Sequence, residues 1–504
     1  MEGSNNLQNE RTKRSIRTKT AELLRNMLHT IDATSAAEAA AAGALSARER
    51  IAALLDADTF VEIGAYRCRR GAEDEFEGVI CGYGSLGGRL VFCFAQEYGR
   101  KKGAFDDVQA DKIEELYAMA CRNGAPVIGI FDSAGAVVYD GVSALAGYGR
   151  VMGCVSRASG IIPQIAILPG VCAGSAAAIA AMFDFALTVK GRTQLYVNPP
   201  FLVDEAAGTA EFAAENGLAA FAAEHEYAAF DFVRALVSLL PQNNAEGTVR
   251  IDTKDDLNRR VDPDALMADP HYDMAALAAM LTDGGSLTEL YAAYAPEMLT
   301  ALAPMGGRVV GLLANRPAVK DGVISVGAAR KAARFIRFCD CFRIPLVMLV
   351  DSVGLDLSAE AERSPYAGEL GRMASAYISA ACPKVTVVVG AAYGAAYTLM
   401  GSKSLGADVA FALERAAISV LPPDASVAFL WNDRIAGDTP AEARAELEAE
   451  WRAMCATPAD AAIRGEIDDI IPSPELRQRI CAALEMLSAK TDLPLTRRHA
   501  NLPL

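Results

Sequence analysis

The chain has 504 residues, of which 52% are hydrophobic and 22% are charged, and its formal net charge is −15. This composition is typical of a globular protein and excludes a largely disordered chain. The length exceeds what one hydrophobic core usually holds, and the acidic balance excludes a general nucleic-acid-binding surface, which needs a basic face.

The N-terminal region is predicted to be a helical arm over residues 9–56, ending in the run SARERIAALLD. The first twenty residues are polar and lack the apolar stretch of a secretion signal. Eleven cysteines are scattered along the chain without a Cys-x-x-Cys spacing. We therefore expect reduced core thiols and a cytoplasmic location.

After the arm, the same passages occur twice. Gly87-Gly88-Arg89 recurs as Gly306-Gly307-Arg308, and Asp132-Ser133 recurs as Asp351-Ser352. A repeat at nearly constant spacing indicates a duplication. We expect two domains, at 1–250 and 251–504, with a polar linker within the stretch 242–264 and a charged helical tail near the C-terminus.

Within each copy, the sequence predicts a strand after the Gly-Gly-Arg turn, a glycine-containing loop, an amphipathic helix and a second buried strand. The expected helices are VQADKIEELYAMACRNG and GAARKAARFIRFCDCFR, and the second strands are PVIGIFDS and PLVMLVDS. Continuous apolar strands between helices are typical of a sheet that is covered by helices.

Each copy ends in a strand, a glycine turn and a run of small residues. PQIAILPGVCAGSAAAIA at 163–180 aligns without a gap with PKVTVVVGAAYGAAYTLM at 383–400. Residues 161–183 carry no charge and are long enough for a membrane span. Prolines and glycines interrupt this segment, and its counterpart contains Lys384, so a buried strand and a short helix are the favoured interpretation.

Several kinds of catalytic site are poorly supported. The four histidines are His29, His225, His271 and His499, and none falls in a strand-turn-helix passage, which disfavours a Ser-His-Asp hydrolase. No phosphate-binding loop, dinucleotide fingerprint or metal-ligand cluster is present. The first N–H groups of a small-residue helix, however, have no partner in the helix, and two of them could stabilise a thioester oxyanion.

The tandem resembles the biotin-dependent acyl-CoA carboxyltransferases, that is, propionyl-CoA carboxylase β chains and methylmalonyl-CoA decarboxylase α chains. The markers of the resemblance are SARERIAALLD at 46–56, GGRVVGLLANRP at 306–317, KAARFIRFCDCFRIPLVMLVD at 331–351, GAAYGAAYTLMGSKSLGADVAFA at 390–412 and RRHANLPL at 497–504. The resemblance covers nearly the whole chain. It implies an α/β fold, a tandem of ββα-spiral domains of the ClpP/crotonase superfamily.

The resemblance also implies a carboxyl transfer between carboxybiotin and the α-carbon of a short-chain acyl-CoA, with one backbone oxyanion hole in each domain and no metal. The expected hexamer works with a separate biotin carboxyl carrier protein, because no Met-Lys-Met acceptor is present, and with a biotin carboxylase or membrane decarboxylase subunits. Membrane insertion and nucleic-acid binding are not expected.

The site residues follow from the positions that match the family's motifs. The N–H groups of Gly174 and Ser175 would bind the thioester enolate, and those of Ala395 and Ala396 the biotin ureido oxygen. The remaining expectations are biotin contacts at Gly394, Gly354 and Tyr393 and substrate contacts at Ala134, Gly135, Ala136 and Thr398.

Some family motifs are changed in this chain. The family motif Ser-Gly-Gly-Ala-Arg is replaced here by Ser133-Ala134-Gly135-Ala136-Val137. The family motif Gly-Gly-Ala is replaced by Gly394-Ala395-Ala396. These changes favour an alternative, a catalytically silent paralogue that assembles with an active carboxyltransferase. A third hypothesis is a CoA-thioester hydratase or isomerase, with Asp140 or Glu205 as the carboxylate that such an enzyme usually needs.

Overall fold

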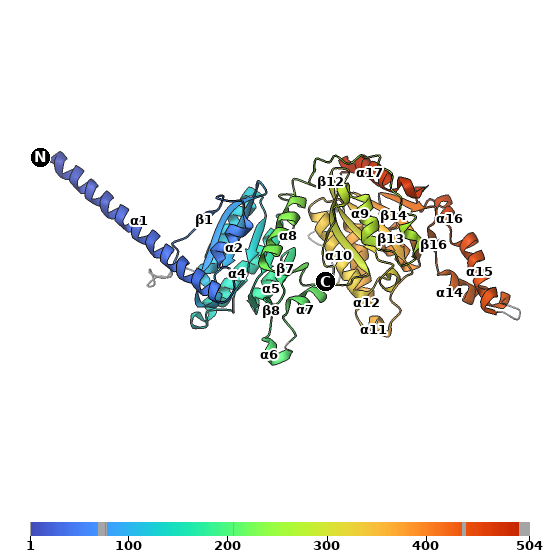
Figure 1. Cartoon of the computed structure of the whole chain (residues 1–504), viewed down its shortest axis with the longest axis horizontal. Helices are drawn as coiled ribbons and strands as arrows, with labels where there is room; N and C mark the ends of the chain where they lie inside the picture. The colour runs from blue at the N-terminus through green and yellow to red at the C-terminus, as the bar shows by residue number, and fades with distance from the viewer. Residues whose placement is uncertain (1, 69–75, 77, 205, 436–439, 493–504) are drawn as a thin grey trace. The chain divides into compact units, whose positions relative to one another are not determined.

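The computed structural model describes residues 2–68, 76, 78–204, 206–435 and 440–492, with side chains except at 2–19 and 440. Two compact units divide the chain. Unit 1 comprises Met1–Ala213 and Phe221–Ser238, and unit 2 comprises Ala214–Ala220 and Leu239–Leu504. Each unit is built on a sheet with helices packed against it (Figure 1).

The sheet of unit 1 begins with an antiparallel meander and continues with parallel strands. In spatial order its strands are β1 (Val61–Ile63), β2 (Val79–Leu86), β3 (Arg89–Gln96), β4 (Val127–Ile130), β5 (Gln164–Leu168), β7 (Phe185–Val189) and β9 (Phe221–Ala223). A parallel pair, β6 (Val171–Ala173) and β8 (Gln194–Tyr196), forms a small second sheet.

The helices between residues 2 and 239 precede, connect or follow these strands. They are α1 (Glu2–Ala41), α2 (Ala47–Leu54), α3 (Asp107–Asn123), α4 (Val142–Ala158), α5 (Ser175–Ala181), α6 (Pro200–Val203), α7 (Ala210–Glu215) and α8 (Glu226–Leu239). The predicted helical arm is thus two helices, α1 and α2. The break falls before Ser46, which caps α2 in a capping box with Glu49.

The sheet of unit 2 has the same plan. In spatial order its strands are β10 (Thr288–Glu289), β11 (Met298–Met305), β12 (Arg308–Asn315), β13 (Leu346–Ser352), β14 (Lys384–Tyr393), β15 (Val409–Leu413) and β17 (Asp469–Ile471), and β16 (Ala417–Ser419) pairs with the end of β14. The helices are α9 (Met274–Leu281), α10 (Val326–Cys341), α11 (Ala359–Arg363), α12 (Tyr366–Ser379), α13 (Ala395–Leu399), α14 (Pro423–Leu430), α15 (Pro440–Cys455), α16 (Pro458–Ile463) and α17 (Leu476–Met486).

The repeated Gly-Gly-Arg passages are two-residue hairpin turns. Gly87 and Gly88 have φ values of 59° and 77°, and Gly306 and Gly307 have values of 60° and 74°. Two consecutive positive φ angles are required by the turn that suits twisted antiparallel strands, which explains the glycines. The turns lie between β2 and β3 in unit 1 and between β11 and β12 in unit 2.

The uncharged segment 161–183 contains β5, β6 and α5 and is not one continuous helix. In the described residues, none of the helices combines the length and apolarity needed to cross a bilayer. The strand-turn-helix prediction for this segment is confirmed.

Candidate functional site

The first glycine turn leads from β6 into α5. Gly174 has a φ of 61°, and its N–H donates to the carbonyl oxygen of Tyr196 at 2.9 Å. Within the described ranges, the N–H groups of Ser175 and Ala176 have no acceptor, as expected for the first residues of a helix. The prediction that the N–H of Gly174 binds the ligand is therefore wrong. That N–H donates to a carbonyl oxygen of β8, and the N–H groups available to a ligand are those of Ser175 and Ala176.

The second glycine turn repeats this geometry between β14 and α13. Gly394 has a φ of 56°, and its N–H donates to the carbonyl oxygen of Ser419 in β16 at 3.0 Å. No acceptor is found among the described residues for the N–H groups of Ala395 and Ala396. Both units therefore present two adjacent peptide donors at corresponding positions.

A buried aspartate lies behind each turn. One carboxylate oxygen of Asp132 accepts the N–H of Val171 at 3.1 Å, and one of Asp351 accepts the N–H of Ala391 at 2.7 Å. Asp132 lies two residues after β4, and Asp351 is the second-last residue of β13. The carboxylates therefore fix the start of each turn relative to the sheet.

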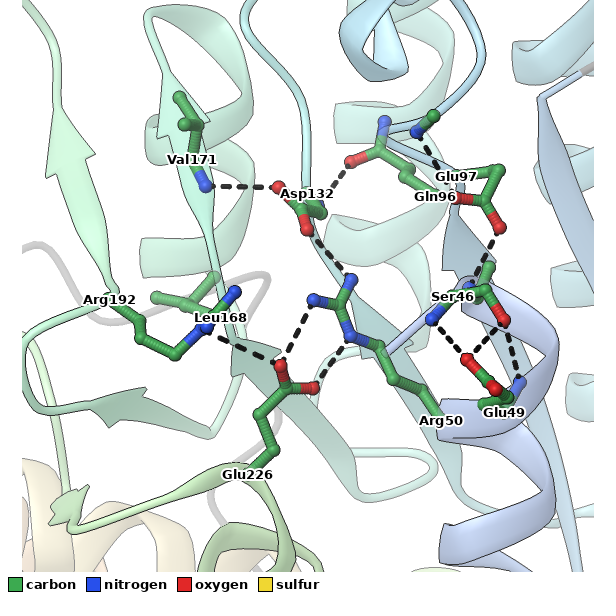
Figure 2. A network of polar contacts seen from close by, with 12 residues as sticks. Ser46, Glu49, Arg50, Gln96, Glu97, Asp132, Leu168, Val171, Arg192 and Glu226 are labelled. Carbon is green, nitrogen blue, oxygen red and sulfur yellow. Dashed lines mark hydrogen bonds and ion pairs between the residues drawn. The ribbon is translucent and has the colours of Figure 1, made fainter. Parts of the chain in front are cut away.

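The partners of Asp132 form a buried ionic network (Figure 2). Nη1 of Arg50 lies 2.7 Å from Asp132, and Nε of Arg50 lies 2.7 Å from Glu226. The Arg50 side chain is only 1% exposed. Burial raises the pKa of Asp132 above its usual value, while the adjacent Arg50 guanidinium opposes that shift. The guanidinium holds two carboxylates from distant parts of unit 1 together.

Asp351 has a different partner. The hydroxyl of Tyr272 donates to its carboxylate at 3.0 Å. Burial raises the pKa of Asp351, and the hydrogen bonds from Ala391 and Tyr272 lower it. In the described part of unit 2, no cation forms an ion pair with this carboxylate. The aspartate behind the first turn is thus paired with a cation, Arg50, and the one behind the second turn with a neutral hydroxyl.

A glycine loop approaches each turn from the neighbouring strand. Gly135 and Gly354 have φ values of 125° and 140°, and both N–H groups donate to the serine two residues earlier. In unit 1, the N–H of Ser133 donates to the carbonyl oxygen of Val171 at 2.6 Å. The loop that contains Ala134, Gly135 and Ala136 is thus joined to the first turn.

A cavity of about 500 Å³ adjoins the start of the first turn. Its wall includes Asp132, Gly170 and Val171, together with the basic residues Lys101, Lys102 and Arg192. Both lysines are exposed and have positive φ values of 51° and 56°. Such backbone angles are uncommon for residues other than glycine and frequently occur at ligand sites.

The comparisons with known proteins all indicate one family. The family model described as the carboxyl transferase domain matches residues 38–502. The propionyl-CoA carboxylase carboxyltransferase subunit of Haloferax mediterranei is 36% identical over 484 residues, covering 92% of this chain and 94% of that protein. Methylmalonyl-CoA decarboxylase subunit alpha of Propionigenium modestum is 37% identical over 487 residues, with the same coverages. The chain belongs to the carboxyl transferase family.

A solved structure agrees with this assignment. Transcarboxylase 12S, whose structure is described as a hexamer with hydrolysed methylmalonyl-CoA bound, superposes with a TM-score of 0.90 at 33% identity. The alignment covers 96% of this chain and 98% of that one. The expected crotonase-like α/β fold is confirmed, as is carboxyl transfer between biotin and an acyl-CoA as the activity of this carboxyl transferase.

The other expected site residues lie at different depths. Tyr393 is 6% exposed, at the end of β14, whereas Thr398 is exposed on α13. Asp140 ends a short 3-10 turn before α4, and Glu205 lies outside the described residues. In the described ranges, no three His, Cys, Asp or Glu side chains cluster as metal ligands would.

Sequence reasoning missed the supports behind the turns. Asp132 and Asp351 were visible as part of the repeat, but no role was assigned to them. Arg50 lies inside the SARERIAALLD motif. The helical spacing of that motif does not indicate that Arg50 pairs with Asp132, which is 82 residues further along the chain. Tyr196 and Ser419 share the pattern x-Val-x-Pro-Pro, a signal that could have linked them to the two turns.

Proposed function

We propose that the chain is a carboxyltransferase subunit of the propionyl-CoA carboxylase or methylmalonyl-CoA decarboxylase type. The names of the relatives at 36% and 37% identity support these acyl groups. The observation that carries the proposal is the pair of glycine turns, each with two peptide N–H groups that have no acceptor in the described chain.

The first turn would hold the thioester. Ser175 and Ala176 would donate to the carbonyl oxygen as negative charge develops on it in the enolate. One such donor typically contributes about 10²–10³ in rate. Ala134, Gly135 and Ala136 lie in the loop joined to this turn and would contact the acyl-CoA.

The second turn would hold the ureido oxygen of biotin through Ala395 and Ala396. Gly354, Tyr393 and Gly394 would lie beside the ring. Glycine at 394 is explained by its φ of 56° and by the Val420 carbonyl oxygen, which would lie 3.2 Å from a Cβ there. Two unpaired donors match one carbonyl acceptor, so the residues present fit the group. Biotin on a separate carrier chain would supply the carboxyl group and take up the α-proton on its ring nitrogen or, in the reverse direction, take the carboxyl group and give up that proton.

The cavity beside the first turn would take part of the CoA moiety. Lys101, Lys102 and Arg192 supply positive charge for an anionic ligand. Two of the three carboxylates in the wall are already engaged, because Asp132 pairs with Arg50 and Glu97 accepts the N–H of Ala47 at 2.9 Å.

The proposal extends to domains and assembly. Residues 1–250 would serve the acyl-CoA and residues 251–504 the biotin, with Thr398 tuning acyl chain length. A hexamer is proposed from the assembly described for transcarboxylase 12S. The partners would be a biotin carboxyl carrier protein and either a biotin carboxylase or membrane decarboxylase subunits.

Ser175→Pro and Ala395→Pro test the two donor pairs. Proline is tolerated at the first helical position, where its missing N–H would have no partner in the helix. Decarboxylation of methylmalonyl-CoA with free biotin should fall about 10²–10³-fold in either variant. The matched control Ser175→Ala keeps the N–H and should stay near the wild-type rate.

A wild-type rate in both proline variants would refute the donor assignment. The silent-paralogue alternative predicts a different result. The unmodified chain would then assemble normally but show no turnover with malonyl-CoA or methylmalonyl-CoA.

A further inference from the structure

Each glycine turn is anchored by a segment with the pattern x-Val-x-Pro-Pro. Tyr196–Pro200 begins at the last residue of β8 in unit 1, and Ser419–Pro423 begins at the last residue of β16 in unit 2. The two short strands run parallel to the strands that enter the turns. Their registers pair Ala173 with Tyr196 and Tyr393 with Ser419.

A valine follows directly after each anchoring peptide. The carbonyl groups of Tyr196 and Ser419 accept the N–H groups of Gly174 and Gly394, and the next residues are Val197 and Val420. Val197 is 68% exposed and Val420 is 83% exposed. Both are therefore exposed apolar groups one residue from a bond that fixes a proposed ligand-binding turn.

The backbone around each valine is constrained. Pro199 and Pro422 have φ values of −53° and −55°, and they precede helices α6 and α14, which begin at Pro200 and Pro423. Proline fixes φ, and valine itself has a stiff χ1. Each valine thus lies between a paired strand residue and two prolines whose φ is fixed.

The free space differs between the two turns. A Cβ built on Gly174 would have no heavy atom within 4 Å, whereas one on Gly394 would meet the carbonyl oxygen of Val420 at 3.2 Å. The first turn has room at its side for a substituent, and the second is narrower. This difference suits an acyl chain of variable length at the first turn and a flat ring at the second.

We infer that Val197 and Val420 determine specificity at the two turns, Val197 by contacting the acyl chain of the thioester and Val420 by contacting the biotin ring. This inference rests on the proposed function, which assigns the thioester to the first turn and biotin to the second. One methylene more or less in such a contact usually changes discrimination by about 10–200-fold.

The test uses the full chain and its Val197→Phe variant, titrated calorimetrically with acetyl-, propionyl- and butyryl-CoA. The larger side chain should weaken butyryl-CoA binding at least about 10-fold relative to acetyl-CoA, by steric exclusion of the longer chain. Val61→Phe is the matched control, since Val61 is 47% exposed on β1. Its ratio of dissociation constants should stay at the wild-type value.

Val420→Phe tests the second turn. The KM for free biotin in the methylmalonyl-CoA decarboxylation assay should rise about 10-fold, while the dissociation constants of the three thioesters stay unchanged. A Val197→Phe variant that weakens all three thioesters equally, or none of them, would overturn the inference for Val197. An unchanged KM for biotin would overturn it for Val420.

Failure of the proposed function gives a separate result. If the unmodified chain binds no thioester, the proposed function fails, and this inference fails with it before any variant is compared. If the unmodified chain binds thioesters without turning over methylmalonyl-CoA, the proposed acyl group fails, and the chain-length ratios still decide the role of Val197.

Discussion

The carboxylate of Asp351 lies where a side chain on Gly390 would have to lie. A Cβ built on Gly390 would be 2.1 Å from Oδ2 of Asp351, and one on Gly170 would be 2.3 Å from Oδ1 of Asp132. Neither glycine has a positive φ. Close approach of the aspartate, and not backbone conformation, therefore explains glycine at both positions.

Gly390→Ala should lower the free energy of unfolding by about 1–3 kcal/mol, because the added methyl group overlaps the Asp351 carboxylate. Urea denaturation measures this change. Gly368→Ala is the control, since no heavy atom lies within 4 Å of its Cβ position in α12. The control should leave the stability unchanged or raise it by up to ~1 kcal/mol. Equal effects of the two substitutions would contradict the steric explanation.

Arg50→Met should lower the free energy of unfolding by about 3–5 kcal/mol, because it leaves Asp132 and Glu226 buried without their cation. Arg67→Met is the control, because it removes an ion pair at the surface. The side chains of Arg67 and Glu115 are 38% and 46% exposed. Loss of such a surface pair should cost less than ~1 kcal/mol. Denaturation curves of both variants measure the difference, and similar midpoints would argue against a structural role for the buried network.

Lys331 should make stability depend on pH. Burial lowers the pKa of this lysine to about 7, although its Nζ donates to the carbonyl oxygens of Tyr291 and Tyr294 at 2.7 and 2.8 Å. The unfolded chain keeps the ordinary, higher pKa, so between these values it binds more protons than the folded chain. The free energy of unfolding therefore rises with pH above about 7, by at most ~1.4 kcal/mol per pH unit for one group.

Lys331→Met removes that titration. The variant should lose stability, because the carbonyl groups lose their donor, and its pH slope should be flatter than that of the wild type above about pH 7. Urea unfolding at a series of pH values measures both slopes. Parallel curves for the two proteins would show that Lys331 keeps its ordinary pKa.

Tyr272→Phe should lower the free energy of unfolding by about 1–2 kcal/mol, because it removes the only side-chain donor described for the buried Asp351 carboxylate. Tyr66→Phe is a control on a tyrosine that is 44% exposed, and it should have little effect. Thermal unfolding compares the two. A midpoint unchanged by Tyr272→Phe would mean that water replaces the lost donor.

Local sequence patterns predicted most of the fold. Strands β4 and β13 fall within the passages predicted from the repeat, and β3, β12, α3 and α10 extend only one residue beyond theirs. The predicted Gly-Gly-Arg turns and the break of 161–183 into strand, turn and helix also agree with the structure. These features depend on neighbours in the chain, through apolar periodicity, proline and positive φ at glycine.

The duplication, the family and the two glycine turns could be predicted from the sequence alone, because each depends on motifs of neighbouring residues in the chain. Only the tertiary structure decided which donors remain open at the first turn, since the Tyr196 carbonyl reaches Gly174 through the pairing of β6 and β8. The partners of the two aspartates were likewise decided by the fold. Arg50 lies 82 residues from Asp132 and Tyr272 lies 79 residues from Asp351, and contacts over such separations depend on how strands and helices pack.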